Sequence, residues 1–229
     1  MPRRSPSTPR TPVRVAVMVS GSGTNLQALL DAIEADPDFG GEVVVVGSDR
    51  AGAGGLDRAR DAGIPTVVCA LADAPDRPTW EAGLRAELEQ HDPQVIVLAG
   101  FMKILTAVFL AGWPDRVINT HPSLLPAFRG ARAVGEALAY GVKLTGCTVH
   151  LVDEQVDHGP IVAQEAVAVR DGDTEASLHG RIQRVEHRLL PAAVKLLCHG
   201  ALQLDGRHVR AVLDPDTPDP DTPDPKEPS

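Results

Sequence analysis

The segment Asn119-Thr-His-Pro-Ser-Leu-Leu-Pro126 contains the side chains best suited to chemistry in this sequence. Asn119 offers a neutral amide that can donate to a developing oxyanion, and His121, two residues on, can carry a proton near neutral pH. The pair predicts acyl transfer. Ser123 lacks the strand-turn-helix elbow of a hydrolase nucleophile, so we interpret it as a structural hydroxyl.

A glycine-containing turn lies between an apolar run at residues 13–19 and a helical pattern at residues 26–35. Glycines let backbone amides approach an anion, and a helix N-terminus adds partial positive charge. The turn is therefore either a phosphate-binding loop or simply a tight connection between a strand and a helix. The candidate phosphate donors are Ser22, Gly23, Thr24 and Asn25.

A dinucleotide site is a competing interpretation of this turn, because Asp49 follows the next apolar run, where a ribose-binding carboxylate would lie. The third glycine of that fingerprint is replaced by Leu26, however, and a side chain there would crowd the helix against the sheet. Thr24 and Asn25 instead suit a single phosphate. We therefore predict a mononucleotide-type phosphate and no NAD.

These residues are distributed along a chain in which short apolar runs alternate with helical patterns. The runs are residues 13–19, 43–46, 66–68, 95–98 and 117–118. Continuous apolar strands separated by helices predict a buried parallel sheet with right-handed crossovers. The expected fold is α/β, a doubly wound, mostly parallel, Rossmann-like sheet, and such sheets bind ligands at the carboxyl ends of their strands.

The second half of the chain departs from this rhythm. Two longer runs, at residues 147–152 and 161–169, flank a turn and predict an antiparallel edge on the sheet. A long C-terminal helix is expected over residues 174–197, capped by Asp173 or Thr174, because apolar side chains recur there at helical spacing.

Composition argues against several classes of protein. The 229 residues include 31 acidic and 22 basic side chains, a formal net charge of -9, so no nucleic-acid partner is expected. Three cysteines without close pairing and histidines without ligand spacing predict neither disulfides nor a metal site. No apolar run suits a secretory signal or a membrane span, which predicts a cytoplasmic protein without membrane contact.

The two ends of the chain differ from its centre. Residues 1–12 are rich in Pro, Ser, Thr and Arg, and residues 214–229 repeat an acidic, proline-rich pattern, so both are predicted to be disordered tails. Residues 13–213 between them are predicted to form a single domain, long enough to bury a sizeable core.

Four motifs occur in an order that resembles a known family. They are Gly21-Ser-Gly-Thr-Asn25, Leu98-Ala-Gly-Phe-Met-Lys-Ile-Leu105, Asn119-Thr-His-Pro-Ser-Leu-Leu-Pro126 and Asp157-His-Gly-Pro160. The series is similar to that of the phosphoribosylglycinamide formyltransferase family, folate-dependent enzymes of purine biosynthesis, over almost all of residues 13–213. The resemblance implies transfer of a formyl group from 10-formyltetrahydrofolate to the amine of glycinamide ribonucleotide, by direct attack through a tetrahedral intermediate.

The resemblance also implies that Asn119, His121 and Asp157 form the catalytic group. Asn119 and His121 would stabilise the formyl oxygen, and Asp157 would orient the imidazole or hold a water that moves the amine proton to the folate nitrogen. Taken alone, Asp157 would be interpreted as a turn residue before Gly159 and Pro160. Neither a metal nor a covalent enzyme intermediate is implied.

Two binding regions are implied as well. The folate would be contacted by Lys103, Ile104, Leu105 and His150. Apolar side chains in the first of these segments could equally fill the core. Gln183 and Glu186, three residues apart on the long helix, would contact the glycinamide ribonucleotide, with a solvated helix face as the alternative. The expected partners are these two small molecules, and the protein is expected to be a monomer or homodimer.

Two other activities stay open. Hydrolysis of 10-formyltetrahydrofolate would use the same catalytic group with water as acceptor, although members of that branch usually carry an extra N-terminal domain. A noncatalytic mononucleotide-binding module would keep the glycine turn without the chemistry. The sequence also departs from the family pattern at residues 127–132, where Arg129 and Arg132 could alter the loop behind His121 or add cationic contacts.

Overall fold

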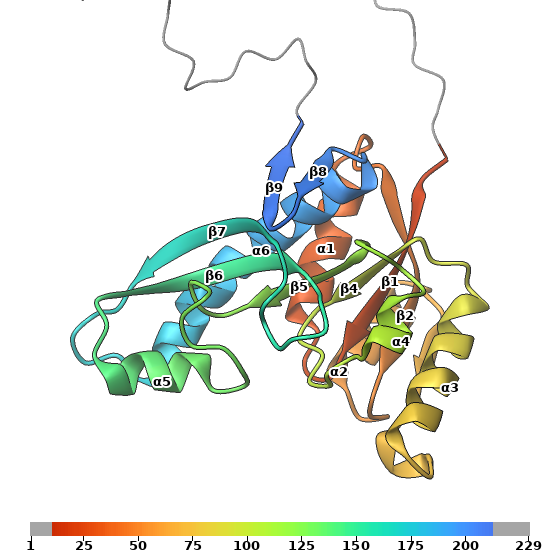
Figure 1. The fold of residues 1–229 in the computed structure, drawn as a ribbon, viewed down its shortest axis with the longest axis horizontal. Coiled ribbons are helices and arrows are strands. Elements are labelled where there is room, and N and C mark those ends of the chain that lie inside the picture. The colour runs from red at the N-terminus through yellow and green to blue at the C-terminus, as the bar shows by residue number, and fades with distance from the viewer. Residues whose placement is uncertain (1–10, 213–229) are drawn as a thin grey trace, which may run out of the picture.

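The computed structural model describes residues 11–212, and most of both predicted tails lies outside the described residues. Within that range nine strands form one sheet in the order β3-β2-β1-β4-β5-β6-β7-β9-β8 (Figure 1). The strands are β1 (Val13–Val19), β2 (Gly41–Ser48), β3 (Thr66–Val68), β4 (Val95–Leu98), β5 (Val117–His121), β6 (Leu144–Leu151), β7 (Ile161–Ala168), β8 (Leu202–Asp205) and β9 (His208–Ala211). The helices are α1 (Thr24–Ala35), α2 (Gly54–Asp61), α3 (Arg77–Glu89), α4 (Ala107–Leu110), α5 (Ala133–Tyr140) and α6 (Glu175–Cys198), with a short 3-10 helix η1 (Leu71–Asp73).

The first five strands form the predicted doubly wound sheet. β1 pairs in parallel with β2 and β4, β2 pairs with β3, and β4 pairs with β5. Strands β1 and β4 are buried along most of their length, which is why their residues are apolar, with Arg14 near the start of β1 as the exception. Met18 pairs with Leu98, and Leu98 pairs with Asn119, so the carboxyl ends of β1, β4 and β5 meet at one edge of the sheet.

The second half of the chain adds antiparallel strands, which confirms the predicted antiparallel extension. β6 pairs antiparallel with β5, and β7 pairs antiparallel with β6. The sheet then continues into β9 and β8, a hairpin that the sequence analysis did not predict; it joins β7 where Ile161 pairs with His208. The Asp205-Gly206 dipeptide, with Asp205 at the end of β8 and Gly206 in the turn, is the signal that could have located it.

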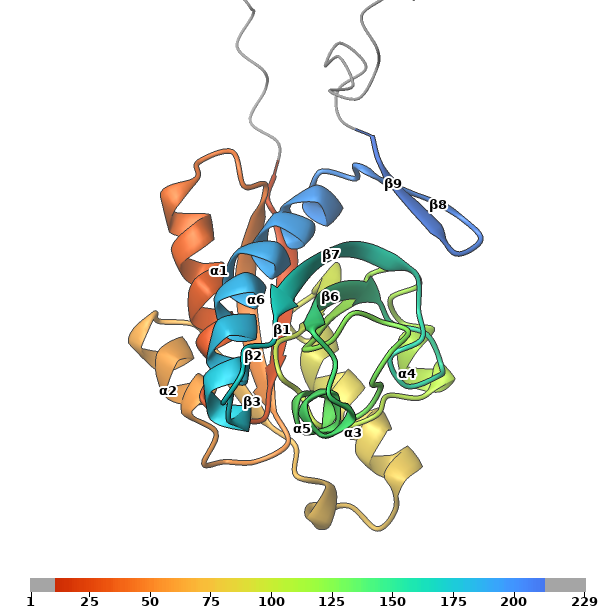
Figure 2. The same cartoon turned by 90° about the vertical axis from the view of Figure 1, so that its left-hand side faces the viewer.

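Helices cover both faces of the sheet, as Figure 2 shows. On one face α1, α2, α5 and α6 pack in a core that includes Val15, Val17 and Val19 of β1. On the other face α3 and α4 pack in a core that includes Ala16 and Met18 of the same strand. This alternation follows from the pleat of the strand, and it divides the interior into two layers.

Helix α6 agrees with the predicted long helix to within one residue at each end. A capping box starts it: the hydroxyl of Thr174 accepts from the N–H of Ser177 at 3.1 Å, and the hydroxyl of Ser177 accepts from the N–H of Thr174 at 3.0 Å. Leu178 and Ile182 bury the apolar stripe of α6 against the sheet. Neither α6 nor any other helix among residues 11–212 is long and apolar enough to cross a membrane.

Candidate active site

Strand β5 carries the central residues of the site at its carboxyl end. Val117 packs in the core beneath α3 and α4, whereas Ile118 packs in the core beneath α1 and α6. Because successive side chains of a strand alternate between faces, Asn119 and His121 point to the α3 and α4 side, and Thr120 points to the α1 and α6 side. The end of β5 therefore presents polar groups to both faces of the sheet.

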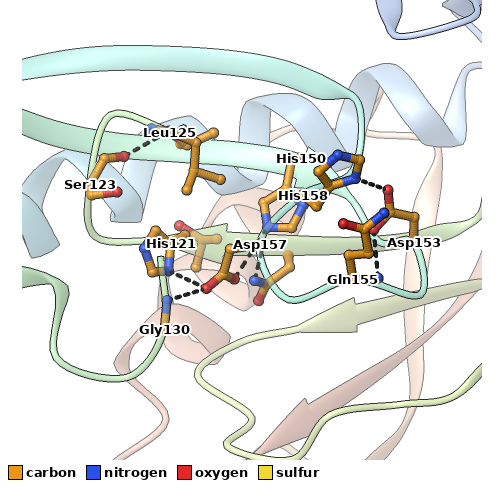
Figure 3. A network of polar contacts seen from close by, with 12 residues as sticks. His121, Ser123, Leu125, Gly130, His150, Asp153, Gln155, Asp157 and His158 are labelled. Atoms are coloured by element: carbon orange, nitrogen blue, oxygen red, sulfur yellow. Dashed lines mark hydrogen bonds and ion pairs between the residues drawn. The ribbon is translucent and has the colours of Figure 1, made fainter. Parts of the chain in front are cut away.

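The imidazole of His121 is buried and bridges two loops. Its Nε2 lies 2.8 Å from the carbonyl oxygen of Phe128, and its Nδ1 lies 3.4 Å from Oδ2 of Asp157. A carbonyl oxygen can only accept, so Nε2 carries a hydrogen, and a second proton on Nδ1 satisfies the contact with the carboxylate. Figure 3 shows Asp157 pointing toward both His121 and Gly130. The geometry favours an imidazole that is charged or shares a proton with Asp157.

The carboxylate of Asp157 is held in place by its backbone and by its neighbours. Its φ is 48°, in the left-handed region that few non-glycine residues adopt, and Oδ2 accepts from the N–H of Gly130 at 2.7 Å. Burial raises the pKa of Asp157, but its polar neighbours, the Gly130 N–H among them, lower it, and the balance lies below the ordinary value. Asp157 is therefore ionised at neutral pH, and its Oδ2 can accept from Nδ1 of His121.

A second histidine orients the amide of Asn119. Nδ1 of His150 lies 2.8 Å from the carbonyl oxygen of Leu151, to which it donates. Nε2 of His150 is then the acceptor for Nδ2 of Asn119 at 3.1 Å. One amide hydrogen of Asn119 is thus engaged, and the other is free to donate to a ligand.

A cavity of about 380 Å³ opens beside these side chains, on the α3 and α4 side of the sheet. Its lining includes every residue predicted for catalysis or folate contact: Asn119, His121, Asp157, Lys103, Ile104, Leu105 and His150. Leu98, Phe101 and Val152 add an apolar wall. The carbonyl oxygen of Ile104 accepts from the guanidinium of Arg77, so this main-chain group is already engaged within the protein.

The glycine turn joins β1 to α1, and α1 begins at Thr24, two residues earlier than predicted. Thr24 and Asn25 therefore lie in the first helical turn, where N–H groups have no intrahelical acceptor and no side chain caps them. Gly23 has a φ of 72°, and a Cβ there would overlap the Cα of Gly55 at the start of α2. The N–H of Gly55 donates to the carbonyl oxygen of Gly21 at 3.0 Å. Helix α2 thus holds the turn in place.

Helix α6 brings its two predicted binding residues to this turn. Gln183 Nε2 donates to the hydroxyl of Thr24 at 2.8 Å. Glu186 is 5% exposed and accepts from Nδ2 of Asn25 at 3.5 Å and from the hydroxyl of Thr120 at 3.4 Å. Burial raises the pKa of the Glu186 carboxyl, and Oδ1 of Asn25 is buried without a hydrogen-bond partner. Glu186 is therefore buried rather than part of a solvated helix face.

Replacing Glu186 by glutamine should stabilise the fold at neutral pH. An unfolded carboxyl ionises near its ordinary pKa of 4.5, whereas the buried one resists ionisation. The unfolded state then releases a proton that the folded state retains, so the stability of the wild type falls as pH rises through this range. Glu186→Gln has no carboxyl at this position and therefore does not lose stability as pH rises. Its Tm should exceed that of the wild type by about 2–4 °C at pH 8 and by less at pH 5. Glu87→Gln, at an exposed position of α3, is the control, and an equal Tm difference at both pH values would contradict this account.

Three groups at the site were not found from the sequence: the N–H of Gly130, the carbonyl oxygen of Phe128 and the hydroxyl of Thr120. Two of them are main-chain groups, which carry no residue-type signal, and Thr120 lies in the motif without having been singled out. Ser123, by contrast, has the structural role expected, because its hydroxyl donates to the carbonyl oxygen of Ala127 at 2.6 Å.

The other residues noted in the sequence have different surroundings, although Sγ of Cys147 lies 3.3 Å from the hydroxyl of Thr120. Arg129 is exposed, and Arg132 is 85% exposed and lies 3.7 Å from Glu136 on its own helix. Cys69, Cys147 and Cys198 are free thiols. In the part of the chain that the structure describes, no group of three or more His, Cys, Asp or Glu side chains is placed to hold a metal ion.

Comparisons with known proteins identify relatives of this chain. The sequence model of the formyl transferase family matches residues 13–194. A phosphoribosylglycinamide formyltransferase of Mycobacterium tuberculosis (strain ATCC 25618 / H37Rv) is 47% identical over 199 residues, which cover 87% of this chain and 91% of that protein. Glycinamide ribonucleotide transformylase 1 from Symbiobacterium toebii has the same fold, with a TM-score of 0.86 and 45% identity over 88% of this chain and 95% of that one.

A related fold also occurs in a protein named for a different reaction. The formyltetrahydrofolate deformylase from Pseudomonas syringae pv. tomato str. DC3000 matches with a TM-score of 0.80 and 26% identity, over 87% of this chain and 66% of that one. The proteins named for transfer are thus more similar in sequence to this chain than the one named for deformylation.

Proposed function

This chain belongs to the formyl transferase family, and from that premise we propose that it transfers the formyl group of 10-formyltetrahydrofolate to the amine of glycinamide ribonucleotide. The observation that carries the proposal is the position of Asn119, His121 and Asp157 at the edge of the sheet. A cavity lies on one side of them, and an uncapped helix N-terminus lies beyond Thr120 and Glu186 on the other. Two substrates can therefore meet at this edge of the sheet, one approaching from each side.

The formyl transfer needs an oxyanion donor and a path for one proton. When bound, the folate supplies the formyl carbon and its N10 as leaving group, and the amine nitrogen forms the new C–N bond. Asn119 donates its free amide hydrogen to the formyl oxygen, where negative charge develops, and His121 places a positive charge nearby. Oδ1 of Asp157, which lies 3.8 Å from Nε2 of His150, accepts the amine proton and returns it through water to N10.

The phosphate of the nucleotide belongs at the N-terminus of α1. The N–H groups of Thr24 and Asn25 lack acceptors there, and the helix dipole adds partial positive charge. Gly23 has positive φ and packs directly against Gly55, so contacts within the protein fix the conformation of the turn. This preorganisation supports a phosphate site rather than a mere connection.

The ribose and amine belong between the phosphate and β5, beside α6. Oδ1 of Asn25 is a buried acceptor without a partner, so a substrate hydroxyl or N–H that donates to it would restore a lost hydrogen bond. Glu186 adjoins it and offers a second acceptor near Thr120. These groups suit a ligand with several hydrogen-bond donors, such as a ribosyl amine.

The folate belongs in the cavity on the α3 and α4 side. Its volume, about 380 Å³, falls in the range of small-molecule sites, and it combines an apolar wall with a few polar groups. The pterin ring is planar and polar at its edges, so it suits such a slot. A cytoplasmic location and a monomeric or homodimeric state belong to the same proposal.

One assay distinguishes transfer from the alternatives. Purified protein is mixed with 10-formyltetrahydrofolate, with and without glycinamide ribonucleotide, and release of tetrahydrofolate is followed by absorbance. Transfer requires turnover that depends on the amine. Turnover without the amine would instead indicate hydrolysis, and nucleotide binding without any turnover would indicate a noncatalytic module.

Replacing Gly23 by alanine should weaken binding of the nucleotide selectively. The new Cβ would require positive φ and would overlap the backbone of Gly55, so the turn must move. We expect the KM for glycinamide ribonucleotide to rise about tenfold or more while the KM for the folate changes less than about twofold. Gly63→Ala is the matched control, because Gly63 has a φ of 70° but open space around its Cβ position. Equal effects of the two substitutions on nucleotide binding would refute the phosphate assignment.

A further inference from the structure

Asp49 stood out in the sequence as a possible ribose-binding carboxylate, and the proposed chemistry leaves it without a role. Its side chain is only 2% exposed, and it follows β2 without lining the cavity. Oδ1 accepts from the hydroxyl of Ser20 at 2.6 Å. Oδ2 lies 3.3 Å from Nζ of Lys103 and 3.5 Å from the guanidinium of Arg50. Both carboxylate oxygens are therefore engaged within the protein, not presented to a ligand.

The partners of Asp49 lead directly to residues 100–105, which we call the cavity loop because all six residues line the cavity. While the Ser20 hydroxyl donates to Asp49, its oxygen accepts from the N–H of Met102 at 2.9 Å. The N–H of Ser20 donates to the carbonyl oxygen of Gly100 at 3.1 Å. With Lys103, these contacts fix the cavity loop at three successive points, two of which depend on Asp49.

We propose that Asp49 is a positioning residue for the formyl donor, because it fixes the cavity loop through Ser20 and Lys103. The inference rests on the proposed function, which assigns the folate to this cavity. A hydroxyl has one hydrogen to give; once Asp49 accepts it, the lone pairs of Ser20 are aimed at the N–H of Met102. Without the carboxylate, that hydroxyl can rotate and the ammonium of Lys103 loses its partner.

The charge on Asp49 is consistent with this role. Burial raises its pKa, but Ser20, Lys103 and Arg50 lower it, and the balance lies below the ordinary value. The carboxylate is therefore charged at neutral pH, as an ion pair with Lys103 requires. A buried, charged acceptor also holds its hydrogen-bond donors more firmly than a neutral one does.

Steady-state kinetics separates positioning from general stabilisation. Asp49→Asn keeps an acceptor for Ser20 but loses the ion pair, and Ser20→Ala removes the link to Met102. Each should raise the KM for 10-formyltetrahydrofolate about tenfold. The KM for glycinamide ribonucleotide should stay within about twofold. Asp61→Asn, at an exposed position of α2, is the matched control. A parallel rise in both KM values, or no change in either, would overturn the proposal.

Amide hydrogen exchange tests the same link without any turnover. In Ser20→Ala the N–H of Met102 should exchange at least about tenfold faster than in the wild type, and in Asp49→Asn it should also exchange faster but by less, because a neutral amide holds the Ser20 hydroxyl less firmly than a carboxylate does. The N–H of Val97, inside β4, should keep its rate in both variants. Unchanged exchange at Met102 in Ser20→Ala would overturn the proposal even if kinetics changed. If the wild type fails to transfer formyl groups at all, the proposed function is wrong, and the exchange rates still decide whether Asp49 fixes the loop.

Discussion

Asp157→Asn should lower the kcat of formyl transfer by about 100-fold or more. The asparagine is nearly isosteric and can still accept from the N–H of Gly130, so the loop keeps its shape. It carries no charge to stabilise a protonated His121, 3.4 Å away, and it is too weak a base to take the amine proton. The measurement is kcat at saturating concentrations of both substrates, together with Tm to show that the fold is retained.

The control for this substitution is Asp171→Asn. Asp171 is fully exposed and lies 3.9 Å from Lys143, so the same chemical change there removes only a surface charge. Its kcat should match that of the wild type. If Asp157→Asn kept more than about half of the wild-type kcat, Asp157 would have no part in the chemistry.

Asn119→Ala should also cost about 100-fold or more in kcat, because it removes the amide that we propose donates to the formyl oxygen. That donation matters most where negative charge develops, in the transition state, so both KM values should change little. The substitution also deprives Nε2 of His150 of its donor, and a small loss of Tm is expected. Gln203→Ala, which removes an exposed amide from β8, is the control.

A companion variant, His121→Ala, tests whether the two side chains act together. We expect a similar loss of about 100-fold in kcat. The double variant should have a kcat no more than about tenfold below that of either single variant, because in the proposed mechanism both groups stabilise the same oxygen. Near-normal kcat in both single variants would remove the basis of the mechanism.

The fold could be predicted where an element is buried on two faces or along one regular stripe, because its sequence then shows a recognisable apolar pattern. Strand β1 has only apolar residues apart from Arg14, and α6 shows both a capping signal at Thr174 and a regular apolar stripe. The hairpin of β8 and β9 has a weaker apolar pattern in its sequence. Its strands are short and mostly exposed, and their stability depends on pairing with a sheet edge that is distant in the sequence.

The candidate active site, too, could be predicted from the sequence only in part. Asn119 and His121 could be recognised because the strand itself places them two residues apart on one face of the sheet. Their partners come from elsewhere: Asp157 from the turn after β6, His150 from β6 itself, and the carbonyl oxygen of Phe128 from the loop after β5. No spacing rule connects these segments, because the antiparallel pairing of β5 and β6 brings them together.

By itself the sequence determined which residue types are available, which stretches are buried strands, and that polar groups end β5 at the edge where parallel sheets bind ligands. Only the tertiary structure decided that Asp49 faces Ser20 and Lys103 rather than a ribose, and that Glu186 is buried beside Asn25. The physical reason is that local patterns depend on neighbours along the chain, whereas the state of a carboxylate depends on whatever donors the fold brings within hydrogen-bond distance.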